Sequence, residues 1–378
     1  MDFLVGIWDT IWGYALPFLF VLTIVVFFHE MGHFLIARLC GVRVTAFSVG
    51  FGPELLGFND SHGTRWKLSA VPLGGYVKFA GDENAASMPD REAAGQMSEE
   101  ELRTSFIGKP VGQRAAVVAA GPIANFILAI VIFAVLFSVY GRSSTLPRVD
   151  SVQAESAAAE AGFMPGDVVL SIEGNDIESF ADIQRIVSVS ADQPLTIKVD
   201  RGGEEIALVA TPKRREIKDQ FGNVQRIGLL GLGQQSRPED RTTKKFSPPE
   251  AVIEGARETW FVVARTAGYL AGIVTGRESA DQLGGPIRVA QFSGQVATLG
   301  IGALLNLAAV LSVSIGLINL MPVPMLDGGH LMFYAYEALR GRPLSEKVQD
   351  IGFRIGIALV LMLMVFATWN DVVHLTTQ

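Results

Sequence analysis

The chain has 378 residues and a formal net charge of −7. Hydrophobic residues make up 49% of it and charged residues 18%, with a mean hydropathy of +0.34, which excludes an ordinary soluble enzyme and favours transmembrane helices combined with a water-exposed domain. The acidic balance argues against a nucleic-acid partner, and the single cysteine, Cys40, excludes both an intrachain disulfide and a cysteine-based zinc site.

The first predicted element is an apolar helix over residues 14–39, which is long enough to cross a bilayer and contains a His-Glu-x-x-His motif. His29 and His33 lie on one face of such a helix, so both imidazoles can bind the same metal ion. Glu30 lies beside that face and can reach a water at the metal without being a ligand. The alternative is a pair of interfacial histidines with a snorkelling glutamate, but ionisable residues in an apolar helix are costly and usually functional.

The start of the chain also bears on this first helix. No lysine or arginine precedes Arg38, so the sequence lacks the basic beginning of a cleavable signal peptide. We therefore expect the helix to remain in the protein.

Residues 43–81 are rich in glycine, valine and aromatic residues, with turn signals at Asn59-Asp60 and Gly74-Gly75. This pattern predicts a small β-sheet or a pair of hairpins packed near the first helix. Its apolar character indicates that part of it dips into the membrane, and a plain cytoplasmic hairpin is the alternative. Residues 82–103 are polar and acidic and predict a loop.

The second predicted span covers residues 115–140. Gly121 and the alanines around it favour close packing against another helix. Asn125 is too polar to face lipid, so we expect it to face a helix or a cavity, where it makes either an interhelical hydrogen bond or a contact with substrate.

Residues 142–234 predict a compact α/β unit, with strands at 168–172, 195–199 and 205–210 and a helix at 179–189. Within it, the stretch AAEAGFMPGDVVLSIEG at 158–174 resembles a bacterial PDZ domain, which has a short helix, a Gly-hydrophobic-x-x-Gly-Asp pattern, a strand and a glycine turn. PDZ domains bind extended peptides by strand addition, so a peptide ligand is one expectation. A rigid plug that binds no peptide is the alternative.

Two further spans are predicted at residues 301–321 and 351–369. The segment 260–275 is short and contains Arg265, so we predict a surface or half-buried helix there. Lysine and arginine are concentrated after the first span and around the fourth, which puts both termini outside, the basic loops in the cytoplasm and the α/β unit on the extracytoplasmic side.

A catalytic zinc takes three protein ligands, and the two histidines supply only two. The candidate third ligand is Asp327, in the stretch INLMPVPMLDGGH at 318–330. An aspartate beside two glycines is usually a turn residue. In the predicted topology, however, the first and third spans run in the same direction, so Asp327 ends on the same side of the membrane as His29 and His33. The other histidines, His62, His330 and His374, are predicted to be structural or solvent-facing.

The HExxH motif, the Asn-x-x-Pro-x-Pro-x-Leu-Asp-Gly-Gly pattern beginning at Asn319, and the PDZ-like unit between them together resemble the site-2 protease family of intramembrane zinc metalloproteases. The resemblance covers nearly the whole chain and is nearest to the regulator-of-sigma-E protease branch. It implies that His29, His33 and Asp327 bind Zn²⁺, that Glu30 is the catalytic acid/base and that Asn319 contacts substrate. The well-known enterobacterial member has two tandem PDZ domains, whereas this chain has room for one.

The fold class we expect is a polytopic α-helical membrane protein with four transmembrane helices, a membrane-associated β-hairpin region and an extracytoplasmic PDZ-like α/β domain. The predicted boundaries are 1–42 for the first helix, 43–114 for the β region and loop, 115–141 for the second helix, 142–234 for the PDZ-like domain, 235–300 for a linker and surface helices, 301–340 for the third helix and 341–378 for the fourth helix and tail.

The resemblance implies hydrolysis of peptide bonds in the transmembrane segments of single-span membrane proteins, such as a trimmed anti-sigma factor or remnant signal peptides. The protein would work in the lipid bilayer of the bacterial inner membrane, with its active site near the cytoplasmic side. The alternatives are a non-catalytic membrane adaptor with a structural metal and a PDZ module, and a metal transporter. Glu30 favours the protease, because neither alternative needs a carboxylate beside the histidine pair.

Overall fold

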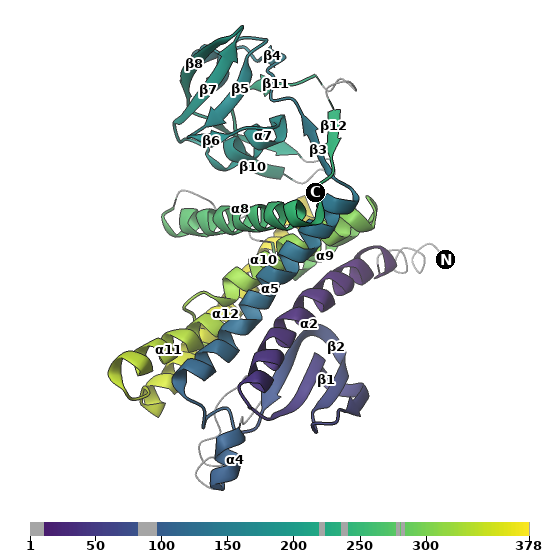
Figure 1. Cartoon of the computed structure of the whole chain (residues 1–378), viewed down its shortest axis with the longest axis vertical. Helices are drawn as coiled ribbons and strands as arrows, with labels where there is room; N and C mark the ends of the chain where they lie inside the picture. Colours follow the sequence, from purple (N-terminus) through teal and green to yellow (C-terminus); the bar gives the residue numbers. More distant parts are fainter. Residues whose placement is uncertain are drawn as a thin grey trace. The chain divides into compact units, whose positions relative to one another are not determined.

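The computed structural model describes residues 11–81, 97–218, 224–235, 241–276, 280 and 284–377. The chain divides into two compact units, one made of Met1–Leu136 with Pro249–Gln378 and the other of Phe137–Pro248. The helices and strands of both units are labelled in Figure 1.

Four helices in the described part of the chain are long and apolar enough to cross a membrane, at Trp12–Leu39, Val111–Val139, Ile301–Asn319 and Glu346–Val373. They contain, in order, α2 (Leu16–Leu39) with the short π-helix η1 (Ile11–Ala15) before it, α5 (Val111–Val139), α10 (Ile301–Asn319) and α12 (Glu346–Thr377). The four spans predicted from the sequence are thus confirmed as candidate membrane helices.

Small residues bring α2, α5 and α10 close together. A Cβ atom on Gly32 of α2 would overlap with the carbonyl oxygen of Ala120 on α5. On the other side of α5, a Cβ on Gly316 of α10 would lie 3.2 Å from both the carbonyl oxygen of Pro122 and the Cβ of Asn125. Glycines at helix contacts allow backbones to approach in this way, as the second span predicts.

The chain makes a tight turn between α10 and α11 (Asp327–Arg340). A Cβ on Gly328 would overlap with the carbonyl of Leu320, and a Cβ on Gly329 with the carbonyl of Val323, so the start of α11 packs directly on the preceding turn. Met325 in this turn has a φ of +91°, which is a strained value for a residue with a side chain. These constraints fix Asp327 as the first residue of α11.

The described residues of the first unit also form α4 (Glu99–Thr104), α8 (Pro248–Val274) and α9 (Pro286–Ala297). The helix predicted at 260–275 is the second half of α8, which is longer than expected but is not among the four candidate spans found in the described residues. Of the loop predicted at 82–103, residues 82–96 lie outside the described residues. The rest includes α4, because Ser98 and Glu101 form a capping box at its start, a signal that the prediction overlooked.

A buried carboxylate joins α12 to α9. Asp371 is 2% exposed and accepts hydrogen bonds from the backbone N–H groups of Gly285, Ile287 and Arg288, at 2.8, 3.1 and 3.1 Å. A carboxylate at a helix N-terminus satisfies unpaired N–H groups and interacts favourably with the helix dipole. This contact therefore holds the end of the last helix in place.

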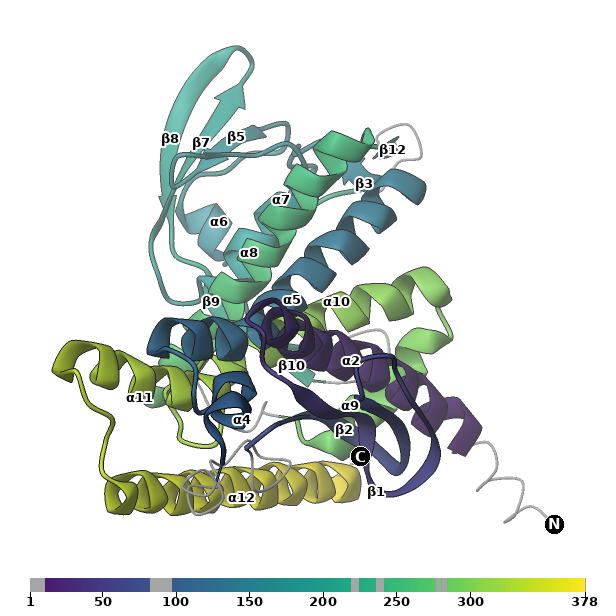
Figure 2. The ribbon, with the colours of Figure 1, turned by 60° about the horizontal axis from the view of Figure 1, so that its bottom comes forward.

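The predicted β region forms one long antiparallel hairpin of β1 (Val44–Asn59) and β2 (Arg65–Phe79), which lies beside α2 in Figure 2. The strands are irregular, and Ser48 is aligned with both Tyr76 and Lys67, so β2 flanks the first half of β1 on two sides. The ring of Phe47 packs 5.6 Å from Phe34 of α2, which anchors the hairpin. The far end of the hairpin exposes large apolar side chains, among them Leu55, Leu56, Phe58 and Leu73.

The second unit contains a four-stranded sheet in the order β6-β5-β7-β8, formed by Asn175–Asp176, Val168–Ile172, Leu195–Arg201 and Glu204–Ala210. Its helices are α6 (Ala157–Glu160) and α7 (Phe180–Val189). The predicted strands and helix are confirmed, and their apolar faces form one core that includes Ile172, Ile197 and Val199.

Shorter strands pair at the borders of this unit. They are β3 (Arg142–Thr145) with β12 (Arg241–Lys244), β4 (Ser151–Val152) with β11 (Leu232–Gly233), and β9 (Lys213–Lys218) with β10 (Val224–Leu229). Residues 241–244, which the sequence assigns to a linker, thus form a strand that joins the start of the unit to its end.

Candidate metal centre

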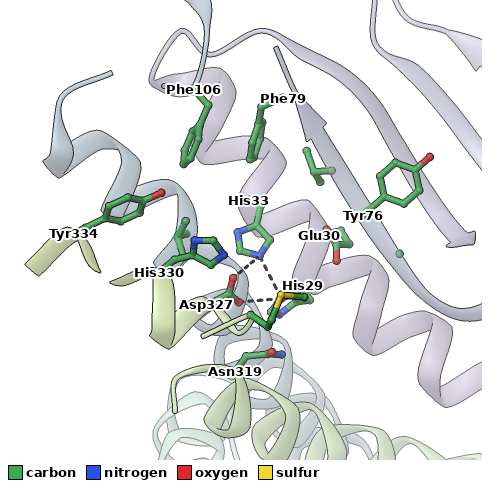
Figure 3. Close-up of a pocket in the computed structure, with 14 residues that line it drawn as sticks. His29, Glu30, His33, Tyr76, Phe79, Phe106, Asn319, Asp327, His330 and Tyr334 are labelled. Atoms are coloured by element: carbon green, nitrogen blue, oxygen red, sulfur yellow. Dashed lines mark hydrogen bonds and ion pairs between the residues drawn. The ribbon is translucent and has the colours of Figure 1, made fainter. Parts of the chain in front are cut away.

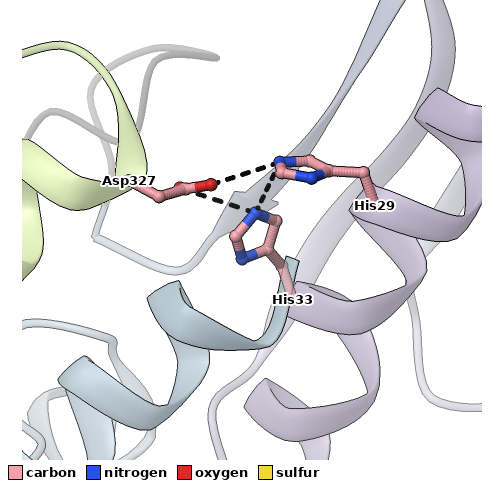
Figure 4. Close-up of side chains that lie close together, drawn as sticks. All are labelled: His29, His33 and Asp327. Atoms are coloured by element: carbon pink, nitrogen blue, oxygen red, sulfur yellow. Dashed lines mark hydrogen bonds and ion pairs between the residues drawn. The ribbon is translucent and has the colours of Figure 1, made fainter. Parts of the chain in front are cut away.

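The two histidines of the HExxH motif and Asp327 meet in the first unit (Figure 4). The Nε2 atoms of His29 and His33 are 3.2 Å apart. Oδ2 of Asp327 lies 3.2 Å from Nε2 of His29, and Oδ1 lies 3.6 Å from Nε2 of His33. The three residues therefore each offer one ligand atom, and these atoms lie within 4.8 Å of one another.

This cluster fits a zinc ion. Two imidazole nitrogens and one carboxylate oxygen form a known donor set of catalytic zinc, which leaves a further position open. The proton of His33 is placed accordingly, because Nδ1 of His33 lies 2.9 Å from the carbonyl oxygen of Val117 and a carbonyl can only accept. Nδ1 of His33 thus donates, and its Nε2 presents a lone pair to the centre of the cluster.

The cluster opens into a cavity of about 190 Å³ (Figure 3). The cavity wall comes from α2, β2, α5, the end of α10, the turn that follows it and the start of α11, together with the turn after α4. It is formed by His29, Glu30, His33, Gly75, Tyr76, Val77, Phe79, Phe106, Val118, Asn319, Met325, Asp327, His330 and Tyr334. The wall thus combines apolar side chains with a group of polar ones, the three histidines, Glu30, Asn319 and Asp327.

Glu30 lies between the histidines and strand β2 in Figure 3. Its carboxylate accepts a hydrogen bond from the backbone N–H of Val77. Gly75 leaves room for the glutamate side chain, since a Cβ atom there would lie 3.2 Å from Cγ of Glu30. The carboxylate is therefore held in the cavity beside the cluster and is not one of the three clustered ligands.

Asn319 is the last residue of α10, and its side chain also lines the cavity. Figure 3 places it on the opposite side of His29 from Phe79 and Phe106. The five residues singled out from the sequence are thus brought together by the fold, although the roles assigned to them stay predictions.

His330 lines the same cavity, a position that the sequence reasoning missed. It follows Asp327 by three residues on α11, so the two side chains share a helix face, and this spacing was a usable signal. Its ring packs 5.4 Å from that of Phe353. Of the other histidines, His62 is exposed and contacts Ser61, and the side chain of His374 lies outside the described residues.

An ion pair holds α11 against the start of α5. The guanidinium of Arg114 donates to the carboxylate of Glu337 at 2.6 Å and lies 4.9 Å from the ring centre of Tyr334. Both members of the pair are less than one-fifth exposed, so the contact is shielded from water. It fixes the helix that carries Asp327 relative to the helix that backs the two histidines.

Comparison with known proteins identifies the family. The profile of Peptidase family M50 matches residues 17–363. A relative from Agrobacterium fabrum (strain C58) that carries the words zinc metalloprotease in its name is 57% identical over 95% of this chain and 96% of its own length. The metalloprotease MmpA of Caulobacter vibrioides is 43% identical over 93% of this chain and 94% of its own length.

One solved structure, the PDZ domain of an SdrC-like protein from Listeria monocytogenes, is 19% identical and covers 22% of this chain and 82% of its own. Its TM-score is 0.18.

The site and the family agree on a zinc-dependent peptidase. The chain belongs to peptidase family M50, the site-2 proteases, which confirms the resemblance read from its two motifs. It is a zinc metalloprotease with four candidate membrane-spanning helices among its described residues, and the enzyme family excludes the non-catalytic adaptor and the metal transporter.

Proposed function

We propose that this protease hydrolyses peptide bonds inside the transmembrane segments of single-span membrane proteins. The observation that carries the proposal is the depth of the metal cluster within an apolar helix. His29 is ten residues before the end of the candidate span Trp12–Leu39, which at 1.5 Å per residue puts it ~15 Å from that end. Because the hydrocarbon core is ~30 Å thick, a site at this depth is within reach of a bond that lies in the bilayer.

In this proposal His29, His33 and Asp327 hold the zinc ion, and Glu30 is the general acid and base. Bound zinc supplies Lewis-acid polarisation of the scissile carbonyl and acidifies a nearby water. The Glu30 carboxylate takes the proton of the attacking water and then gives it to the leaving amine. The hydrogen bond from Val77 keeps this carboxylate on the cavity side of the helix.

A transmembrane substrate is a helix, and its scissile carbonyl is already used in a backbone hydrogen bond. It must unwind into an extended strand before it is cleaved. Gly75, Tyr76 and Val77 of β2 line the cavity beside Glu30, so an extended segment lying along this part of the strand would run past the metal cluster. The Asn319 amide at the other wall of the cavity would hold the substrate backbone from the opposite side.

We also propose a location and substrates. The protein lies in the bacterial inner membrane, with the active site towards the cytoplasm and the Phe137–Pro248 unit outside. Trimmed anti-sigma factors and remnant signal peptides are the substrates that the family resemblance implies. A peptide ligand for the second unit stays a prediction.

The proposal is tested with Glu30→Gln in the full chain, purified in detergent and given a single-span model substrate. We expect cleavage to fall by at least ~10²-fold, as for loss of a general base, while zinc content stays at that of the wild type. Glu100→Gln on the surface of α4 is the matched control and should cleave normally. Near-normal cleavage by zinc-loaded Glu30→Gln would contradict the assignment of Glu30.

Orientation is tested with reporter fusions. Fusions after Gly81 and after Arg342 should report the cytoplasm, and a fusion after Gly202 should report the outside, because the basic residues cluster on the loop after the first span and on the loop between the third and fourth spans. A cytoplasmic signal from the Gly202 fusion would overturn the four-span topology and the placement of the second unit.

A further inference from the structure

One face of α5 lies directly against the two histidines. Val117, Gly121 and Asn125 are spaced four residues apart on this helix, so they share that face. The Val117 carbonyl contacts Nδ1 of His33 at 2.9 Å, and the Asn125 amide contacts Nδ1 of His29 at 3.3 Å. Gly121 lies between them, where a Cβ atom would overlap with Nε2 of His33 and lie 2.9 Å from Cε1 of His29.

Asn125 is completely buried, with 0% of its surface exposed. Helix α10 packs against it, and Ser312 of that helix donates a hydrogen bond to its backbone carbonyl at 2.9 Å. Its Oδ1 atom has no hydrogen-bond partner among the described residues. A buried acceptor left unpaired destabilises the fold, so an unpaired amide oxygen beside a metal cluster needs an explanation.

The tautomers of the two histidines supply that explanation. His33 binds the Val117 carbonyl through Nδ1–H, which leaves the Nε2 lone pair for a metal. For Nε2 of His29 to bind the same metal, its proton must also be on Nδ1, and Nδ1–H needs an acceptor. A half-turn of the Asn125 amide exchanges Nδ2 and Oδ1, and it brings the unpaired oxygen to this nitrogen.

We propose that Asn125 is a positioning residue whose Oδ1 accepts the Nδ1–H of His29 and thereby holds the tautomer that presents Nε2 to zinc. The Val117 carbonyl does the same for His33, so α5 orients both imidazoles although it supplies no ligand. Acceptors of this kind fix the orientation of metal-binding histidines and raise their basicity. This inference rests on the ligand set assigned in the proposed function.

The competing role is an ordinary interhelical hydrogen bond, in which Asn125 donates its N–H to an unprotonated Nδ1. That arrangement would put the histidine proton on Nε2 and oppose metal binding. The two roles are distinguished by Asn125→Asp, because an ionised carboxylate can accept but cannot donate. The acceptor role is preserved in that variant, and the donor role is lost.

The experiment measures the zinc dissociation constant of the full chain in detergent by competition with a chelator. Asn125→Ala and Asn125→Leu should weaken zinc binding by ~10- to 100-fold, as expected for loss of a second-sphere acceptor, while Asn125→Asp should bind within about threefold of the wild type. Ser312→Ala is the matched control, since it removes a buried hydrogen bond of the same helix contact without touching an imidazole. Its zinc affinity should be unchanged.

The outcomes separate this inference from the ligand assignment. His29→Ala tests the ligand set: if it binds zinc as tightly as the wild type, the proposed set is wrong. If His29→Ala loses zinc but a folded Asn125→Ala binds it with wild-type affinity, only the positioning role is overturned. An Asn125→Asp variant that binds zinc as weakly as Asn125→Ala would show the donor role and also overturn the proposal.

Discussion

Each unit contains an aspartate that is shielded from bulk water, but the two carboxylates contact very different partners. The Asp167 side chain in the second unit is 0% exposed, and it accepts hydrogen bonds from Nε and Nη2 of Arg201 at 2.7 and 2.8 Å and from the backbone N–H of Met164 at 2.9 Å. The Asp327 side chain in the first unit is 17% exposed and faces the Nε2 atoms of His29 and His33.

The difference distinguishes a structural carboxylate from one that belongs to a site. Asp167 is neutralised by a guanidinium and satisfied by donors, so it needs nothing further from outside the protein. Asp327 faces nitrogens, of which that of His33 must carry a lone pair because Nδ1 of His33 donates to Val117. Such a convergence of acceptors is repulsive until a cation fills it. Asp167 therefore stabilises the fold of its unit, whereas Asp327 is the proposed metal ligand of the other.

Of the substitutions that test this contrast between Asp167 and Asp327, Asp327→Asn should have the largest effect. It removes the charge of the proposed third ligand, so we expect the zinc dissociation constant to rise by at least ~10-fold and cleavage to fall with it. Asp167→Asn is the matched variant, and it should keep zinc at the wild-type level because its carboxylate faces an arginine. An Asp327→Asn protein that loses activity but keeps its zinc affinity would show that another residue closes the site.

A second large effect is expected at Gly121, where the fold leaves space for the imidazoles and nothing else. Gly121→Ala puts a methyl group onto Nε2 of His33, so the ring must move and zinc content and cleavage should both fall by at least ~10-fold. Gly112→Ala on the same helix meets nothing within 4 Å and should behave as the wild type. Equal zinc content in the two alanine variants would mean that the imidazoles can move away from a methyl group at position 121 without losing zinc.

The parts of this site that could be predicted are those whose residues lie close together in the sequence. His29 and His33 depend on one helical turn, so their shared face could be inferred from spacing alone. Asp327 is almost three hundred residues away, and it became a candidate only through the predicted direction of the spans and then through the family resemblance. Both arguments placed it correctly beside the histidines.

What the sequence could not predict is equally specific. The Val117 carbonyl is a backbone atom with no residue signature, and its contact with His33 depends on how α5 packs against α2. The double alignment of Ser48 in the hairpin depends on bends that no turn motif marks. The length of α8 was underestimated because its first half is amphipathic rather than apolar, so a search for spans passed over it.

The smallest expected effect is a pH dependence confined to the second unit. Burial by itself raises the pKa of Asp167, but the hydrogen bonds from Arg201 and from the Met164 backbone, together with the arginine charge, outweigh it and hold the pKa below its usual value. A carboxyl group with a lowered folded-state pKa stabilises the fold above its unfolded pKa of ~3.9. That stability is lost as the pH falls towards the folded-state pKa, because the unfolded chain takes up the proton first.

We therefore expect the opening free energy of the sheet that begins next to Asp167 to fall by about 1 kcal/mol between pH 6 and pH 3, because a single carboxyl group with an unfolded pKa of ~3.9 takes up its proton only over the last part of this range. Hydrogen exchange of residues 168–172 and 195–201 in the full chain, corrected for intrinsic rates, measures it. Arg201→Met should remove most of this pH dependence, because the partner that lowers the pKa is gone. Lys213→Met is the control: its pair with Glu160 is exposed on both sides and should leave the pH profile unchanged. A profile that is the same in Arg201→Met and in the wild type would mean that Asp167 is not held by its arginine, and the contrast between the two aspartates would then rest on Asp327 alone.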